Sequence, residues 1–334
     1  MLYNIDVFSD AFYKKLAEVL QLPDEVSALL DALYGKLGEL PKLQKRLFKK
    51  RYSALFLKTK TARAAKKRGV HPYTFDFYLL FVAAKRLHAL YEKKCIDQEI
   101  FWDTVKDLKY KLNECFAVHA VWGTFVFDWF AGFYRLTRFC LGRFQYDITK
   151  YYARKPYKKH GFCVMPCQTV YSCHIPSSGP LTKQDALDSY KKAFDFFCGG
   201  KTGGTGFCGK NASGADCGGA NTSGAEKNTI VIVCDSWLLY PPHREFLPPN
   251  SGILAFMDDW DIISHKEDSK FQDAWRIFGA EHTKPYQELP QNTGLQRAYA
   301  RRLQSGKPTG TGFGILIFDG ESIVNVKTDG LPTD

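Results

Sequence analysis

A turn of small residues at positions 177–182 is the stretch whose residue types best suit anion binding. Its sequence is Ser-Ser-Gly-Pro-Leu-Thr, and it lies between a segment that alternates like a strand and one with helical spacing. Backbone N–H groups at such a helix start point toward the turn and favour negative charge, so phosphate is the expected guest. The sequence therefore predicts a candidate phosphate site over this turn.

A plain strand-to-helix connection is the alternative. Thr182 and Asp185 are spaced like a capping box, in which side chains satisfy the first N–H groups of the helix. A carboxylate at the third helical position would also repel a phosphate. The residues of the turn leave both interpretations open.

The elements on either side of the turn follow from periodicity. In residues 170–175, Tyr171 and Cys173 point to one side while Ser172 and His174 point to the other, which is the period of a strand. After the turn, apolar residues recur at helical spacing, at Leu187, Tyr190, Phe194 and Phe197. We expect this helix to lie with its apolar face on a sheet.

The first third of the chain has helical periodicity and no strand signal. Residues typical of helix starts occur at Ser9, Asp24, Pro72 and Asp97. We expect residues 1–119 to form a helical domain. The aromatic-rich segment 117–133 is expected to be a buried helix rather than a membrane span, because it contains polar residues and glycines.

The second half reads as α/β. Expected strands are residues 142–148, 164–175 with a break at Pro166, 229–234, and a closing hairpin over 314–326 with an Asp-Gly turn. Expected helices are 271–278 and 294–303, and the glycine-rich segment 199–228 is expected to be a flexible insert. The predicted fold class is α plus α/β, a helical N-terminal domain followed by a mixed sheet flanked by helices over residues 120–334.

Positive charge is concentrated in one segment. The chain of 334 residues has a formal net charge of +11, and residues 42–68 contain twelve Lys or Arg and no acidic residue. Such a segment could bind nucleic acid through residues 42–68. Its few aromatics are spaced by four, which favours a solvated helix face, so we expect neither nucleic acid nor a membrane as a partner.

The ten cysteines include no C-x-x-C pair, so we expect reduced thiols and no metal site. The start of the chain has no basic segment followed by an apolar run, as a secretion signal would have. A cytoplasmic protein is the expectation.

Three stretches resemble a bacterial family that joins a helical N-acyltransferase N-terminal domain to a GNAT-like C-terminal domain. They are His174-Ile-Pro-Ser-Ser-Gly-Pro-Leu-Thr182, residues 234–257 beginning Cys-Asp-Ser-Trp-Leu-Leu-Tyr-Pro-Pro-His, and residues 289–298. The resemblance covers most of the second half and, in general pattern, the helical half. It implies an acyltransferase of GNAT-like fold that uses acyl-CoA as co-substrate.

The resemblance also implies positions for a site. The pyrophosphate of acyl-CoA would lie over the turn, and the residues expected to contact it are Ser177, Ser178, Gly179, Leu181 and Thr182. The thioester would lie where the family's fourth and fifth strands splay apart, here the strands that end near Ile175 and Cys234. His174 and Asp235 would then come out beside it.

Acyl transfer to an amine needs a base, an oxyanion donor and an acid for the leaving thiolate. We expect His174 to be the base and Asp235 to orient the amine or share that role. Tyr240 is the expected acid, because its offset from the strand end would let it reach the thiol. Each has a structural alternative: His174 as a hydrogen-bonded strand residue, Asp235 as a turn cap, and Tyr240 as a packing residue.

Two classes of function follow. The first is a GNAT-like N-acyltransferase that transfers an acyl group from acyl-CoA to an unknown amine acceptor. The second is a non-catalytic GNAT-like protein that binds a ligand or partner, since a fold can be kept without its chemistry. The single glycine of the turn favours the second, and the polar residues at both strand ends favour the first. Neither the acceptor, the acyl length nor the oligomeric state follows from the sequence.

Overall fold

The computed structural model divides into two compact units, Met1–Phe139 and Cys140–Asp334. The residues that the structure describes are 10–38, 42–57, 70–159, 161–198, 228–268 and 270–326. The glycine-rich segment expected to be a flexible insert lies outside these ranges except for Asn228, as do residues 58–68 of the basic segment.

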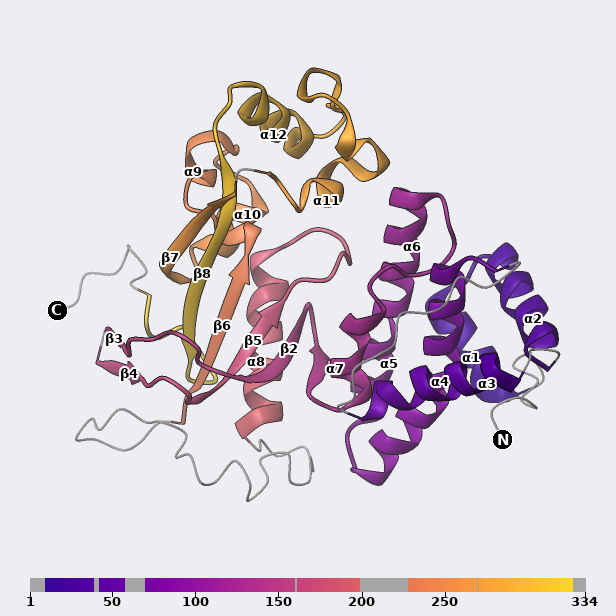
Figure 1. Cartoon of the computed structure of the whole chain (residues 1–334). Coiled ribbons are helices and arrows are strands. Elements are labelled where there is room, and N and C mark those ends of the chain that lie inside the picture. Colours follow the sequence, from indigo (N-terminus) through magenta and orange to yellow (C-terminus); the bar gives the residue numbers. More distant parts are fainter. Residues whose placement is uncertain are drawn as a thin grey trace. The chain divides into compact units, whose positions relative to one another are not determined.

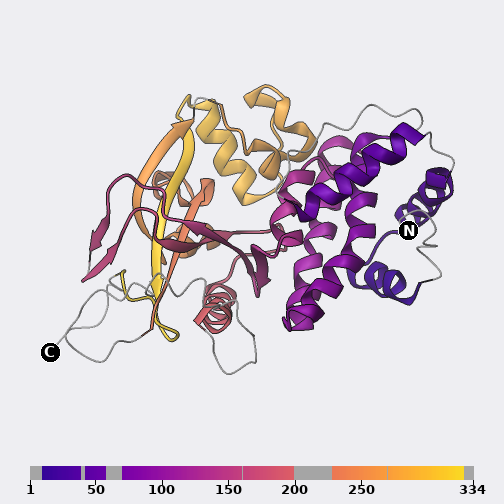
Figure 2. The same cartoon turned by 60° about the horizontal axis from the view of Figure 1, so that its bottom comes forward.

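The regular elements of the first unit are helices, up to the start of β1 (Arg138–Leu141). Its elements are α1 (Ala11–Leu20), α2 (Asp24–Gly38), α3 (Lys42–Phe56), α4 (Pro72–Lys93), α5 (Gln98–Val105), α6 (Asp107–His119), the short 3-10 helix η1 (Phe127–Phe130) and α7 (Ala131–Tyr134). Helix α4 is the most deeply buried, and Figure 2 shows the other helices of this unit arranged around it. Tyr13 donates its hydroxyl to the carbonyl of Val82 at 2.9 Å, which ties α1 to α4.

The boundary between the units falls later in the chain than the predicted position after residue 119. The intervening segment packs on α4, because the Thr124 N–H donates to the Tyr73 carbonyl at 3.0 Å and the Tyr134 hydroxyl donates to the Leu80 carbonyl at 2.6 Å. A Cβ on Gly123 would lie 2.4 Å from the backbone of Tyr73, so only glycine permits this close approach.

The same contacts show that the prediction of one helix over 117–133 was wrong. Helix α6 ends at His119, and the chain crosses the first turn of α4 before η1 and α7 form. The helix expected after Asp97 is also two helices, α5 and α6. Asp10 caps α1, since it accepts from the Phe12 N–H at 2.9 Å; Ser9 lies outside the described residues.

The second unit is built on a six-stranded sheet of order β1-β2-β5-β6-β8-β7 (Figure 1). The strands are β1 (Arg138–Leu141), β2 (Phe144–Lys150), β5 (Thr169–His174), β6 (Ile230–Ser236), β7 (Asp261–Asp268) and β8 (Thr309–Phe318), with a separate hairpin of β3 (Tyr157–Lys159) and β4 (Phe162–Val164). The helices are α8 (Lys183–Cys198), η2 (Trp237–Leu239), α9 (His243–Phe246), α10 (Gly252–Met257), α11 (Ala274–Phe278), η3 (Gly279–Thr283), η4 (Tyr286–Glu288) and α12 (Gly294–Gln304). The sheet is mixed, because β5 and β6 are parallel while β2–β5, β6–β8 and β7–β8 are antiparallel.

The two faces of this sheet differ. On the hairpin face, Val170, Val233 and Ile315 pack with Tyr157 and Val164 of the β3–β4 hairpin. On the helix face, α8 lies over β2 and β6. There the rings of Tyr171 and Phe197 stack at 3.8 Å.

Alternate glycines of β8 let other backbone lie directly on the helix face. A Cβ on Gly312 would lie 2.0 Å from the carbonyl oxygen of Leu239, and one on Gly310 would lie 2.7 Å from the ring of Tyr240. The chain after β6 therefore folds back over the helix face of β8.

These elements confirm the predicted fold class, a helical N-terminal part followed by a mixed sheet flanked by helices. The predicted closing hairpin is present in part: the chain reverses at Asp319-Gly320, and Ile323 makes an antiparallel bridge to Phe318 while the Val324 N–H donates to the Ile317 carbonyl at 2.9 Å. As far as residue 326, however, the returning segment forms no strand, and the strand partners of β8 are β6 and β7. Strand β2 begins two residues after Gly142, whose φ of +74° forms the turn from β1. Neither β1, β7 nor the β3–β4 hairpin was predicted.

The eight described cysteines are free thiols. Among the residues that the structure describes, no helix combines the length and the apolar character that crossing a membrane requires.

Candidate active site

The parallel strands β5 and β6 part near their carboxyl ends. In the described register they pair at Tyr171↔Ile232 and Ser172↔Val233. Beyond that point β5 stays paired with β2, and β6 stays paired with β8. Side chains alternate along a strand, so the next pair to face the hairpin side is His174 and Asp235. Both therefore lie on one face of the sheet, on strands that have separated.

His174 is paired with a carboxylate on the neighbouring strand. Its Nε2 lies 3.0 Å from Oδ2 of Asp147, and the side chains are 28% and 21% exposed. Asp147 faces the same side because it is in register with Ser172. In the neutral ring this contact assigns the proton to Nε2 and the lone pair to Nδ1. The carboxylate orients the ring and would stabilise its protonated form.

Asp235 lies on the same face of the sheet, and its side chain is exposed. Partial desolvation raises the pKa of its carboxyl, and the negative charge of Asp268 raises it further, while Lys266 opposes the shift. A carboxylate whose charge is disfavoured in this way gains from a cationic partner. It could accept the ammonium group of an acceptor.

Tyr240 lies apart from these residues. Its ring packs against Gly310 on the helix face, and the residue is 1% exposed. Burial raises the pKa of the Tyr240 hydroxyl, which the nearby Arg302 partly offsets. The structure brings His174 and Asp147 into contact and places Asp235 on the same face of the sheet, whereas Tyr240 is buried on the other face.

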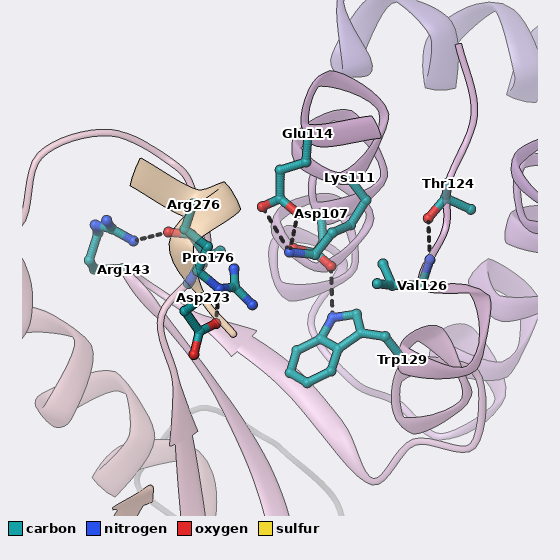
Figure 3. A network of polar contacts seen from close by, with 10 residues as sticks. All are labelled: Asp107, Lys111, Glu114, Thr124, Val126, Trp129, Arg143, Pro176, Asp273 and Arg276. Carbon is teal, nitrogen blue, oxygen red and sulfur yellow. Dashed lines mark hydrogen bonds and ion pairs between the residues drawn. The ribbon is translucent and has the colours of Figure 1, made fainter. Parts of the chain in front are cut away.

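The turn at 177–182 is held by an arginine on the β1–β2 turn. Arg143 donates from Nη1 to the carbonyl of Pro176 at 3.0 Å, from Nη2 to that of Gly179 at 2.8 Å and from Nε to that of Pro180 at 3.3 Å. Figure 3 shows the first of these contacts. Gly179 has a φ of +106°, and nothing lies within 4 Å of where its Cβ would be. Glycine is therefore required here for the backbone conformation and not for space.

The predicted capping pair is present at the start of α8. The Asp185 N–H donates to Thr182 Oγ1 at 3.1 Å, and the Thr182 hydroxyl donates to Asp185 Oδ2 at 2.5 Å. This contact uses one of the helix's first N–H groups and adds a carboxylate to its first turn. The turn is exposed at Ser177 and Gly179, ahead of the cap.

The helical unit has a polar cluster of its own on α6, also drawn in Figure 3. Lys111 pairs with Glu114 at 2.9 Å, and the Trp129 Nε1–H donates to Asp107 Oδ2 at 3.0 Å. Asp107 and Lys111 are buried, 1% and 7% exposed. Buried charges of this kind are stable only when paired, so we interpret the cluster as structural.

Asp147 and Arg143 were missed by the sequence analysis as functional residues. Their signal is the alternation of residues 143–148, which puts Arg143 and Asp147 on the same side of one strand. Pairing of β2 with β5 makes them neighbours of His174 and of the turn. This pairing joins distant parts of the chain, so the periodicity of either strand does not predict it. In the described part of the chain, no group of three or more His, Cys, Asp or Glu is placed to hold a metal ion.

Comparison with family models matches both units. Residues 11–136 match the N-acyltransferase N-terminal domain, and residues 138–316 match the GNAT-like C-terminal domain. The chain belongs to this family of N-acyltransferase proteins with a GNAT-like C-terminal domain. The resemblance seen in the sequence is thereby confirmed, and in the GNAT-like domain the parted strands are β5 and β6.

Solved structures support the same fold. An acyltransferase in complex with CoA and 10C-teicoplanin is 17% identical, with a TM-score of 0.68 over 90% of this chain and 86% of that one. An acyltransferase in complex with decanoyl-CoA and teicoplanin is 19% identical, with a TM-score of 0.62 over 91% and 94%. A third, in complex with decanoyl-CoA, is 18% identical, with a TM-score of 0.62 over 93% and 99%. No curated protein matches the chain.

Proposed function

We propose that the protein is an acyl-CoA-dependent acyltransferase that transfers an acyl group to an amine. The observation that carries the proposal is the His174–Asp147 pair at 3.0 Å, at the end of β5 where it parts from β6. Family membership supports the reaction class. In the family's fold the thioester lies where these two strands part, which would put it beside His174.

The proposed roles follow from the chemistry of each group. Asp235 attracts the acceptor as an ammonium ion, which gives one proton to water to become the free amine. The amine nitrogen then bonds to the thioester carbonyl carbon, Nδ1 of His174 takes the second proton from that nitrogen, the C–S bond breaks, and the thiolate leaves. Asp147 keeps the His174 ring in one orientation and stabilises its positive charge. Tyr240 is not included, because it is buried on the other face.

The turn before α8 is the proposed phosphate site. The candidate donors are the N–H groups of Gly179, Leu181 and Thr182 and the hydroxyl of Ser178, because the Ser178 N–H already donates to the Pro176 carbonyl at 2.8 Å. Ser177 stays a predicted contact. Pro180 has no N–H group. Arg143 engages carbonyls on the turn's other side, so its contribution is to fix the turn. A fixed loop of N–H groups at a helix start loses little entropy when it binds a phosphate.

The donor to test first is decanoyl-CoA, because two of the similar acyltransferases were solved with it. The acceptor is proposed only as an amine. A cytoplasmic location remains a proposal, supported by the free thiols of the described cysteines.

The test of the phosphate site compares Gly179→Asp with Gly179→Ala. Both variants strain the same positive φ, but only the aspartate adds a charge over the turn. We expect Gly179→Ala to bind decanoyl-CoA within a few-fold of the parent, and Gly179→Asp to lose binding by calorimetry. Equal binding by the two variants would contradict the site. Release of free CoA with simple amines, followed by mass spectrometry, distinguishes an enzyme from a protein that only binds acyl-CoA.

A further inference from the structure

A strongly basic element lies on the second unit, away from the carboxyl end of β5. It comprises the end of β2, the connection to β3 and the β3–β4 hairpin, residues 150–159 and 161–165, and we call it the cationic hairpin. It contains five Lys or Arg, and the chain has no acidic residue between Asp147 and Asp185. Figures 1 and 2 show β3 and β4 projecting beside the sheet.

One side of the cationic hairpin is fixed to the sheet. The Tyr157 hydroxyl donates to Asp261 Oδ2 at 2.9 Å and accepts from Asn325 Nδ2 at 3.1 Å. Lys159 pairs with Asp261 at 2.7 Å, and Val164 is buried beside Tyr157. The hairpin is therefore an ordered part of the fold.

Its other side presents cations and two large apolar side chains to solvent. Arg154, Lys155 and Lys158 are exposed, and within the described residues they make no ion pair. Tyr152 is 80% exposed and Met165 is 52% exposed. Such exposure of large apolar side chains costs free energy in water.

Backbone contacts bring the two apolar side chains to the same end of the element. The Tyr151 N–H donates to the Gln168 carbonyl at 2.8 Å, and the Cys167 N–H donates to the Tyr151 carbonyl at 2.9 Å. The turn that follows Met165 therefore lies next to the chain at Tyr152.

We propose that the cationic hairpin docks the protein on an anionic lipid surface. Lys and Arg attract anionic headgroups, tyrosine prefers the headgroup level, and a methionine side chain can enter the acyl region. A nucleic acid would use the cations and could stack on Tyr152, but it would leave Met165 in water. The proposal differs from the expectation that no membrane is a partner, since surface docking needs no spanning helix.

The experiment is co-sedimentation with phosphatidylcholine vesicles, with and without phosphatidylglycerol. We expect binding only to the anionic vesicles, weaker at high salt. Charge reversal at Arg154→Glu, Lys155→Glu and Lys158→Glu should reduce it about tenfold or more. Tyr152→Ser with Met165→Ser should weaken it at unchanged charge. All five side chains are exposed, so unchanged melting temperatures will show that the variants fold.

A matched control reverses three exposed charges of the helical unit, Arg46→Glu, Lys50→Glu and Lys93→Glu. It should bind anionic vesicles like the parent. Equal loss in the control would show that net charge, not the hairpin, is responsible, and would overturn the proposal. So would binding that is unaffected by the Tyr152 and Met165 changes, or tighter binding to an RNA oligonucleotide than to the vesicles.

Discussion

Polar side chains on the hairpin face of the sheet are exposed to solvent, whereas those in the layer over the helix face are buried. On the hairpin face, His174 and Asp147 are partly exposed and paired with each other at 3.0 Å, and Asp235 on the same face is exposed. In the layer over the helix face, His243 is fully buried against Tyr299, and Asp259 is buried against Tyr190. The polar groups of the hairpin face are therefore accessible to solvent and substrate, and those over the helix face are not.

The difference shows in the protonation of the buried groups. Burial lowers the pKa of His243 to about 4, which its neighbour Arg302 reinforces, and burial raises the pKa of Asp259 to about 6. Such groups are held in one state by desolvation, which suits packing and not proton exchange with a substrate. His174, by contrast, is partly exposed and oriented by a carboxylate, so it is open to a substrate. Environment, more than residue type, therefore decides which histidine can act as a base.

Removing His243 should have the largest effect on stability. His243→Ala leaves a cavity and takes from the buried Tyr299 hydroxyl its 2.5 Å partner. We expect a loss of about 3 kcal/mol in the free energy of unfolding, measured with urea. The folded fraction should transfer acyl groups at the parent rate. A stable variant without activity would instead place the catalytic base at His243.

Acid should destabilise the parent through the same residue. The folded pKa of His243, about 4, lies below its ordinary value of 6.5, so its contribution to stability is present above pH 6.5 and is lost as pH falls toward 4. Between pH 7 and pH 5 this amounts to about 2 kcal/mol. In urea titrations, the free energy of unfolding of His243→Phe should differ less between pH 7 and pH 5 than that of the parent. An unchanged difference would assign the acid sensitivity to other groups.

Replacing Asp259 should have a smaller effect of the opposite sign. Its folded pKa, about 6, lies above the ordinary value of 3.8, so its contribution to stability is full below pH 3.8 and is lost as pH rises through 6. Asp259→Asn removes the buried charge and keeps an acceptor for the Tyr190 hydroxyl. We expect a gain of about 1 kcal/mol at pH 8 and none near pH 4, seen as a raised melting temperature only at pH 8.

The features that could be predicted from the sequence are those set by residues close together in the chain. Local patterns predicted β5, α8 and the cap of α8 by Thr182 and Asp185, because alternation, helical spacing and capping act within a few residues. The family resemblance placed His174 and Asp235 at strand ends. The partner Asp147 depends on the β2–β5 register, which is a contact between distant parts of the chain.

The position of Tyr240 could not be predicted either, because it depends on a contact between distant parts of the chain. Its offset from the end of β6 suggested that it could reach the thiol, but the chain reverses after η2 and packs on the glycines of β8. The face of the sheet on which Tyr240 lies is decided by its packing on Gly310, about seventy residues later in the chain. The β7 strand was missed because a bulge between Ile262 and Ser264 breaks its alternation.

The most direct test of the central claim measures both binding and transfer of decanoyl-CoA by His174→Ala. The account predicts unchanged binding by calorimetry and a kcat about 10²-fold lower or more, with a smaller loss for Asp147→Asn. His265→Ala, which removes an exposed histidine of β7, serves as the control and should keep the parent rate. If His174→Ala transfers the acyl group as fast as the parent does, His174 is not the base and the account is contradicted.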